Sequence, residues 1–259
     1  MASNVYFQAF KTSLLTKLEY RSDFFMGVGA ALGLQAAALG TLWVVLNQTP
    51  SLVGWSGTQV VLLFGLTAMI QSFSELFFNN VWNIPTYIVR GQIDRLLVYP
   101  VKSLPFFLVT SPELHAFGNF SGGAIMFCYA AHALHLPFAV FALVPLWVIC
   151  GSFVHTSFLV FCCALSFRFM GQKGQHFWVV NALLMSTRYP VGIYPNAFKF
   201  LVLFLVPMAA SNFLPVGWIL GSSSLFLALA APLLAAGLSA WMAFKVWAWG
   251  LKRYESTGS

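Results

Sequence analysis

The chain has 259 residues, of which 59% are hydrophobic and 17% aromatic, while only 7% are charged. A soluble domain carries about 25% charged residues, so this composition excludes a water-soluble fold, and the high apolar content excludes intrinsic disorder. The net charge of +7 is spread in small groups between long apolar runs, unlike the dense basic face that nucleic-acid binding requires. We therefore expect an all-α polytopic membrane protein, a single transmembrane domain over residues 1–259 with no nucleic-acid partner.

The N-terminal part predicts a surface helix followed by two membrane spans. Residues 4–21 carry apolar side chains at helical spacing, which suits an interfacial helix lying along the membrane. Two apolar runs of about 20 residues, the length needed to cross a bilayer, follow at 24–46 and 58–78. Gly29, Gly33 and Ala37 in the first run repeat every four residues and form a small-residue face that favours close contact with another helix.

Glu75 is a carboxylate inside the second apolar run. A lone carboxylate at membrane depth is costly, so it must pair or lie at the inner interface. Because the basic residues Arg90 and Arg95 follow closely in sequence, we expect a structural ion pair between Glu75 and one of them. A driving proton site is the alternative for this residue.

Residues 79–105 form the most polar internal stretch, and Pro85, Pro100 and Pro105 punctuate it. Its part 83–103, NIPTYIVRGQIDRLLVYPVKS, is polar and basic. Between the prolines, residues 87–99 are predicted to form one short helix. Leu96, Leu97 and Val98 are available there for burial in a partner, and a solvated loop without function is the alternative.

Four further spans are expected after this stretch, which gives six in total. The segment before the last span differs from the others, because prolines at 190, 195, 207 and 215 break it into short apolar pieces. Such pieces at membrane depth need shielding by protein or water, which predicts a broken, re-entrant segment. The expected ranges are spans at 106–131, 138–167 and 177–189, the re-entrant segment at 190–215, and the last span at 222–249.

The basic residues agree with six spans and with both termini in the cytoplasm. Cytoplasmic connectors carry an excess of Lys and Arg. With the N-terminus inside and alternating spans, all basic residues except Arg188 and Lys199 fall on the inner side, eleven of the thirteen in the chain. An odd number of spans places the C-terminal basic group outside.

No motif for catalysis or nucleotide binding occurs in the sequence. It lacks the GxxxxGK[ST] loop that cradles phosphates, the HExxH zinc motif and the GxSxG nucleophile elbow. His132 and His135 have no nearby carboxylate or thiolate to complete a metal site, and Glu113 beside His115 is an unspecific acid–base pair. We therefore expect no enzyme activity, cofactor or metal in this chain.

The segment after the second predicted span contains Gly91, Ile93, Asp94, Leu97 and Pro100 in the pattern G-x-[IL]-D-x-x-L-x-x-P. Together with the N-terminal helix and the YPVGIYP and VPMAASNFLP segments before the last span, this pattern resembles the ABC type-2 transporter permeases. More narrowly, the chain is similar to the bacterial six-span permeases that work with a separate ATPase subunit. The resemblance covers nearly the whole chain.

The resemblance implies the permease subunit of an exporter in the bacterial cytoplasmic (inner) membrane. Its partners are ATP-binding cassette ATPase subunits, which hold ATP and Mg, a second permease that is a copy or a sister chain, and membrane lipid. A cytoplasmic coupling helix docks on the ATPase, and re-entrant elements close the outer end of the pathway. Carried over to this sequence, the coupling residues are Arg90, Gly91, Ile93, Asp94, Arg95 and Leu97, and the re-entrant gate residues are Pro190, Tyr194, Pro195 and Pro207.

Two other function classes remain open from the residues. A secondary transporter or channel independent of ATP usually places several ionisable groups at mid-membrane, and here Glu75 and His155 are the candidates. A membrane-embedded transferase needs clustered acid–base groups at one interface, and only Glu113 and His115 qualify. The apolar spans favour a hydrophobic or amphipathic substrate, with drugs, lipidic molecules and saccharide chains all open.

Overall fold

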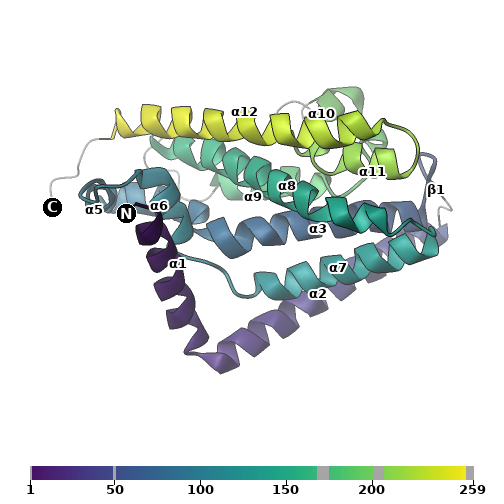
Figure 1. Ribbon diagram of the computed structural model, residues 1–259, viewed down its shortest axis with the longest axis horizontal. Helices are drawn as coiled ribbons and strands as arrows, with labels where there is room; N and C mark the ends of the chain where they lie inside the picture. Colours follow the sequence, from purple (N-terminus) through teal and green to yellow (C-terminus); the bar gives the residue numbers. More distant parts are fainter. Residues whose placement is uncertain (1, 49–50, 168–174, 201–206, 255–259) are drawn as a thin grey trace.

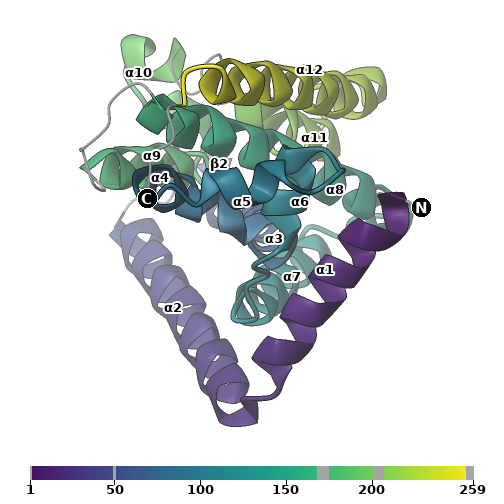
Figure 2. The same cartoon turned by 90° about the vertical axis from the view of Figure 1, so that its left-hand side faces the viewer.

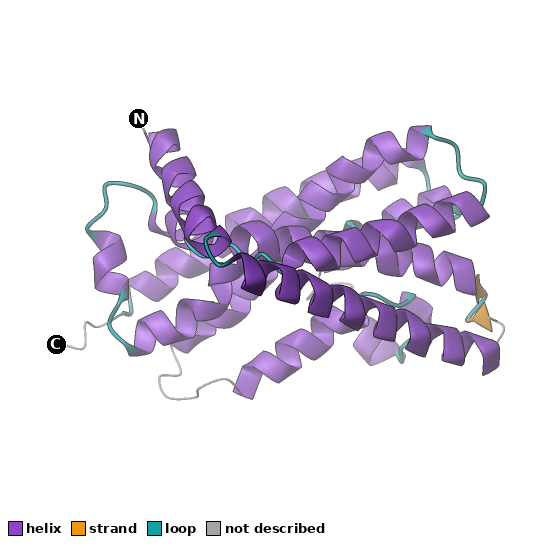
Figure 3. Cartoon of the chain, turned by 90° about the horizontal axis from the view of Figure 1, so that it is seen from below, coloured by secondary structure: helices purple, strands orange, loops and turns teal. Residues whose placement is uncertain are grey.

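The computed structural model describes residues 2–48, 51–167, 175–200 and 207–254. Within those ranges the protein is almost entirely helical, and its strands form one short hairpin at one end (Figure 3). The longer helices are α1 (Ala2–Leu18), α2 (Arg21–Gln48), α3 (Gly57–Phe78), α7 (Ala116–Ala133), α8 (Ala139–Ala164), α9 (Gln175–Ser186) and α12 (Leu225–Leu251).

Short elements connect these helices. They are β1 (Ser51–Leu52), β2 (Trp55–Ser56), η1 (Asn79–Asn83), α4 (Ile84–Val89), α5 (Ile93–Leu97), α6 (Ser103–Val109), η2 (Leu165–Phe167), η3 (Val191–Ile193), α10 (Asn196–Phe200), η5 (Pro207–Ala210) and α11 (Phe213–Ile219), where η marks a 3₁₀ helix. The antiparallel hairpin pairs Leu52 with Trp55. It leads directly into α3, which starts with a capping box between Ser56 and Gln59.

The helices α2, α3, α7, α8 and α12 run roughly along the long axis of the molecule (Figure 1). The short helices α4, α5 and α6 gather at the end where α12 finishes, and they cover that end in the view along the axis (Figure 2). The hairpin and α11 lie at the opposite end. We call these the α5 end and the α11 end of the bundle.

Helix α3 lies in the core of the bundle, packed along α7 and α8, and thirteen of its 22 residues are buried. Its contact with α7 is backbone to backbone. A Cβ added at Gly65 meets the backbone nitrogen of Phe127 at 2.7 Å and the carbonyl oxygen of Gly123 at 2.8 Å. Glycine at both crossing positions therefore lets the two helices approach closely, as small residues do between membrane helices.

Helix α1 crosses the α5 end of the bundle instead of running along it (Figure 1). Figure 2 shows that α1 and α2 form a V whose apex stands away from the other helices. Ser13 Oγ donates to the Thr110 carbonyl at 2.8 Å, and the ring of Phe10 stacks on Phe77 at 5.4 Å. Phe7 remains 64% exposed. A transverse helix with an exposed aromatic side chain suits the expected interfacial position.

Four helical segments are long and apolar enough to cross a membrane, by length and composition: Arg21–Gln48, Gly57–Val89, Ala139–Phe167 and Leu225–Leu251. They overlap the first, second, fourth and last predicted spans. The small-residue face predicted on α2 receives no helix in the described chain, since a Cβ added at Gly29 or Gly33 meets no atom within 4 Å.

The structure corrects the predicted third span at 106–131. Helix α6 ends at Val109 and α7 begins only at Ala116, so the two are separate. Pro112 explains the break, because proline lacks a backbone N–H and disfavours helical geometry at the residue before it. Helix α7 alone has 18 residues, about 27 Å at 1.5 Å per residue.

The predicted fifth span at 177–189 coincides with α9, which has 12 residues and so a length of about 18 Å. In the predicted re-entrant segment at 190–215, the described part consists of short pieces, η3, α10, η5 and the start of α11. Pro190 precedes η3, and Pro207 is the first residue of η5. Proline thus stands at the start of two of these pieces, where its missing N–H is tolerated.

Substitution of Gly65 by alanine tests the backbone contact between α3 and α7. The added methyl group meets backbone atoms that cannot rotate away, so the helices must separate, and overpacking of this kind costs about 1–3 kcal/mol. We expect a lower midpoint of thermal unfolding for Gly65→Ala in detergent. Gly237→Ala on α12 is the matched control, because its Cβ faces open space; equal midpoints for the two variants contradict the close contact.

Candidate functional site

The polar stretch at the α5 end forms two short helices, and this corrects the prediction of one helix over 87–99. Helix α4 ends at Val89 and α5 begins at Ile93. Gly91 between them has a φ of +66°, a left-handed conformation that glycine adopts without steric cost. The glycine therefore ends α4 and redirects the chain.

Burial divides this stretch into an inner and an outer face. The side chains of Ile88, Ile93 and Leu96 are buried against the bundle. Leu97 and Val98 point outward, with 51% and 83% of their surface exposed. We call the exposed residues between positions 89 and 100 the α5 surface: Val89, Arg90, Asp94, Arg95, Leu97, Val98, Tyr99 and Pro100. Of the predicted coupling residues, Arg90, Asp94, Arg95 and Leu97 therefore lie on a surface, Ile93 is an anchor and Gly91 a hinge between helices.

Aromatic rings fix the α5 surface to the bundle. The ring of Tyr87 in α4 contacts Phe107 of α6 edge-on at 4.9 Å, and Phe107 stacks on Trp247 of α12 at 6.1 Å. Trp247 in turn contacts Phe167 at 5.6 Å and donates its indole N–H to Ser103 Oγ at 3.0 Å. The cluster links α4 and α6 to α12 and to η2, which follows α8, so these elements form one packed unit.

Two contacts extend this attachment to both ends of the chain. The Tyr6 hydroxyl of α1 accepts a hydrogen bond from the backbone nitrogen of Lys102 at 3.1 Å. Burial and then the neighbouring Asp94 carboxylate raise the pKa of Tyr254, which places Asp94 near the chain shortly after the end of α12 at Leu251. Asp94 therefore also faces the C-terminal part of the chain.

Glu75 does not pair with Arg90 or Arg95, which corrects the predicted ion pair. Its Oε2 lies 4.0 Å from His115 Nε2 and accepts a hydrogen bond from Asn119 Nδ2 at 3.4 Å. The arginines lie on the exposed α5 surface, whereas Glu75 points from α3 towards α7. Sequence distance suggested the wrong partner because the connection between α6 and α7 brings His115 back to α3.

The connection between α6 and α7 carries an ionic cluster that holds α1. Glu113 Oε2 accepts from Lys17 Nζ at 3.0 Å, and its Oε1 lies 3.3 Å from His115 Nδ1. The hydrogen bond from His115, aided by Lys17, lowers the pKa of Glu113 to about 2 against the opposing effect of burial. The same hydrogen bond raises the pKa of His115. The two residues that the sequence offered as an unspecific acid–base pair are thus in contact.

A second polar cluster lies deeper in the bundle, and sequence reasoning missed its main member. Arg188, expected in an outer connector, folds inward from the end of α9. Its Nε and one terminal nitrogen donate to Gln71 Oε1 of α3 at 2.9 and 2.5 Å, and its guanidinium carbon lies 5.1 Å from the ring centre of Phe64. One feature of the sequence pointed to this position: the apolar run before Arg188 is too short to cross a membrane, so Arg188 need not lie in a connector outside it.

Other polar side chains of α3 also find partners on different elements. Asn212 donates to Thr67 Oγ1 at 3.0 Å. Ser74 Oγ lies 2.7 Å from Thr156 Oγ1 and 2.9 Å from His155 Nδ1, both on α8. Among the residues that the structure describes, no group of three or more His, Cys, Asp and Glu side chains gathers as a metal ligand set.

The predicted gate residues fall into two places. Pro190 is buried, and Tyr194 donates its hydroxyl to the Ser186 carbonyl at 2.9 Å, which ties the chain after η3 back to α9. Pro195 is exposed next to it. Pro207 instead lines a pocket of about 140 Å³ on the seam between α8 and α12.

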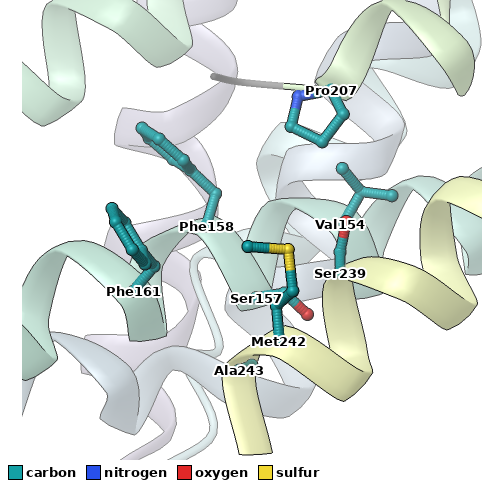
Figure 4. A pocket seen from close by; sticks show the side chains of 8 residues that line it. All are labelled: Val154, Ser157, Phe158, Phe161, Pro207, Ser239, Met242 and Ala243. Carbon is teal, nitrogen blue, oxygen red and sulfur yellow. The ribbon is translucent and has the colours of Figure 1, made fainter. Parts of the chain in front are cut away.

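Figure 4 shows this seam pocket, with Met242 of α12 directed towards Phe158 of α8 and Pro207 at its margin. A second pocket of about 130 Å³ follows along the same seam and shares Ser157 and Ala243 with the first. Aromatic, aliphatic and small hydroxyl side chains line both pockets, which suits an apolar molecule.

The ionic cluster around Glu113 predicts a defined pH dependence of stability. The lowered pKa of Glu113 contributes stability above about pH 4.5 that is lost as the pH falls towards 2. The raised pKa of His115 contributes stability below pH 6.5 that is lost as the pH rises through the folded-state value. We expect His115→Gln to lower the thermal midpoint at pH 5.5 and to change it less at pH 9. A difference from wild type that is the same at both pH values refutes this contribution.

A comparison with protein families finds a match to the ABC-2 family transporter proteins over residues 32–258. Searches of curated proteins and of solved structures each found no significant match. The family match covers most of the chain, including the α5 surface, the aromatic cluster and the segment before α12. The chain therefore belongs to the ABC-2 family of transporter proteins, as a multi-pass membrane protein that serves as a permease subunit of an ABC transporter.

Proposed function

We propose that this chain is the membrane subunit of an ATP-driven exporter and that the α5 surface docks on a separate ATPase subunit. The observation that carries the proposal is the two-sided construction of this stretch. Ile93, fully buried, anchors it, while Leu97 and Val98 present apolar side chains to the outside with Arg90 and Arg95 beside them. Apolar residues with a charged border are typical of protein interfaces.

The aromatic cluster supports a route by which ATPase movement reaches the membrane helices. Displacement of α4 moves Tyr87 against Phe107, and Phe107 is stacked on Trp247 of α12. Phe167 at the end of α8 is packed so tightly on Gly250 that a Cβ there collides with its ring. Rigid contact of this kind passes a rotation of α4 and α5 on to α8 and α12, because packed aromatic rings do not deform continuously.

Two permeases, identical or sister chains, form the translocation pathway in this proposal. Helix α2 is largely uncovered within the described chain, since only 17% of its most apolar part is buried. In α12 the buried share of the most apolar part is 11%. Helices with so much free apolar surface have room for lipid and for a second permease. The open small-residue face at Gly29 and Gly33 favours close helix contact on the α2 side.

The proposed orientation places the α5 end in the cytoplasm of a bacterial inner membrane. Helix α1 crosses this end, α12 finishes there, and the basic residues Arg90, Arg95 and Lys102 lie on or beside it. This arrangement agrees with the excess of positive charge on cytoplasmic connectors. In this proposal the four long apolar segments are four of the six spans. Helix α7 is a further span, and α9 together with the broken segment that follows it is the sixth. The α11 end then closes the pathway on the outside.

The substrate proposed is a hydrophobic or amphipathic molecule. The seam pockets between α8 and α12 offer apolar walls with Thr156, Ser157 and Ser239 as the polar contacts. Together the two pockets extend along the helices, which suits an elongated apolar group better than a compact polar one.

Replacement of Val98 by aspartate tests the docking surface. A charge at the centre of the apolar patch must be desolvated in the complex, so we expect the tagged chain to lose a stoichiometric ATP-hydrolysing partner during purification from cells that produce the whole transporter. The readout is ATPase activity per permease in the purified fraction, together with the thermal midpoint of the permease.

Phe138→Asp is the matched control, because Phe138 is 87% exposed and Val98 83% exposed, and Phe138 lies at the start of α8 near the α11 end. We expect this variant to retain the ATPase. Retention of the ATPase by Val98→Asp, or its loss from both variants alike, excludes the α5 surface as the docking site.

A further inference from the structure

Arg188 lies beside the middle of α3, one of the helices long and apolar enough to cross a membrane. Its guanidinium is held between Phe64 and Gln71, which are seven and fourteen residues from Gly57 at the start of α3. At 1.5 Å per residue these positions lie about 10 and 21 Å along the helix, and a hydrocarbon core is about 30 Å thick. An arginine at this depth is expensive, and such residues usually mark substrate or ion pathways.

The protein satisfies only part of the hydrogen-bonding capacity of this guanidinium. Arginine carries five N–H donors, and two of them go to the single oxygen Gln71 Oε1. Among the described residues no other acceptor lies within hydrogen-bond distance of Arg188. Gln71 is itself engaged, since its amide nitrogen donates to the Leu184 carbonyl at 3.1 Å.

The positive charge of Arg188 also lacks a direct counter-charge. Five of the six acidic residues of the chain lie in the described ranges, and none is within 4 Å of Arg188. Glu75, one helical turn beyond Gln71 on α3, attracts Arg188 from a longer distance, while its own contacts are with Asn119 and His115 on the α7 side. The groups that touch Arg188 are an amide and an aromatic ring, which are neutral.

We propose that Arg188 binds the anionic head group, a phosphate or carboxylate, of an amphiphilic molecule inside the permease. The guanidinium fork matches these groups geometrically, and charge-assisted hydrogen bonds are about twice as strong as neutral ones. The side chain is mostly buried but keeps some exposed surface, and in this proposal an anion reaches it there. This inference rests on the proposed transport function and narrows its substrate class to anionic amphiphiles.

The membrane depth of Arg188 favours an amphiphile over a free ion. A small anion must shed its hydration shell to enter the apolar interior, whereas an amphiphile offsets that cost by burying its own chain. The alternative role for Arg188 is purely structural, as a tie between α9 and α3 through Gln71. The two roles differ in one respect: only the first needs a positive charge without a carboxylate in contact with it.

Binding of dodecyl phosphate to the full-length protein, purified in a neutral maltoside detergent, tests the proposal. Arg188→Met removes the charge, and Gln71→Glu supplies an internal carboxylate at the atom that already accepts both N–H groups. We expect each variant to bind dodecyl phosphate at least about tenfold more weakly than wild type, the effect of one lost charge-assisted contact. Gln71→Glu keeps the tie between α9 and α3, so it decides the question if Arg188→Met does not fold.

Lys199→Met is the matched control, because it removes the same charge from an exposed position on the neighbouring α10, and we expect wild-type affinity. Dodecyltrimethylammonium has the same alkyl chain with a positive head group, and inorganic phosphate has the anionic group without the chain. We expect wild type and Arg188→Met to have the same affinity for each of these two compounds. If wild type, Arg188→Met and Gln71→Glu bind dodecyl phosphate with equal affinity, the proposed site is wrong. If wild type binds inorganic phosphate as tightly as dodecyl phosphate, the site does not select an amphiphile. ATPase association is not involved, so loss of this site and loss of the docking surface are separate results.

Discussion

The need to satisfy polar groups inside an apolar bundle organises this protein around α3. Hydrocarbon offers no hydrogen bonds, so every polar side chain at membrane depth must find a partner within the protein. The polar side chains of α3 find theirs on different elements: Thr67 on Asn212, Gln71 on Arg188, Ser74 on α8 and Glu75 on α7. Apolar packing alone tolerates rotation or sliding of a helix, whereas these pairs fix the register of α3 against α7, α8 and the residues Arg188 and Asn212.

This constraint also reaches the docking surface, because α3 continues through η1 into α4 without leaving the bundle. Asn80 in η1 donates to the Phe107 carbonyl and to Thr110 Oγ1, both at 2.8 Å. Phe107 belongs to the aromatic cluster that holds Tyr87 and Trp247. The α5 surface is therefore attached to the central helix by covalent continuity, by hydrogen bonds and by ring packing. A partner that moves this surface acts directly on the core of the bundle.

The sequence predicted those features that composition and local chemistry determine. Four of the predicted spans coincide with helices long and apolar enough to cross a membrane. The prolines before α12 predicted the short, broken pieces of the segment at 190–215. The predictions that were wrong concern features that depend on contacts between residues distant in sequence or on backbone conformation. Glu75 was assigned to Arg90 or Arg95 because they are near in sequence, yet His115 is brought to it by the return of the chain after Pro112. The break at Gly91 depends on a positive φ, which a glycine permits but does not require.

Arg188 differs most clearly between the position expected from the sequence and the position in the structure. The topology expected from the sequence places Arg188 in an outer connector. There it counts as one of two outer basic residues and lowers the excess of basic residues on the inner side. Since its guanidinium lies against Phe64 and Gln71, it does not belong to a connector, and Lys199 remains as the only basic residue expected outside. The topological bias is then eleven to one, stronger than the sequence indicated. An arginine that membrane orientation does not need, at a depth where it is costly, is retained for a different reason, and recognition of an anionic group provides one.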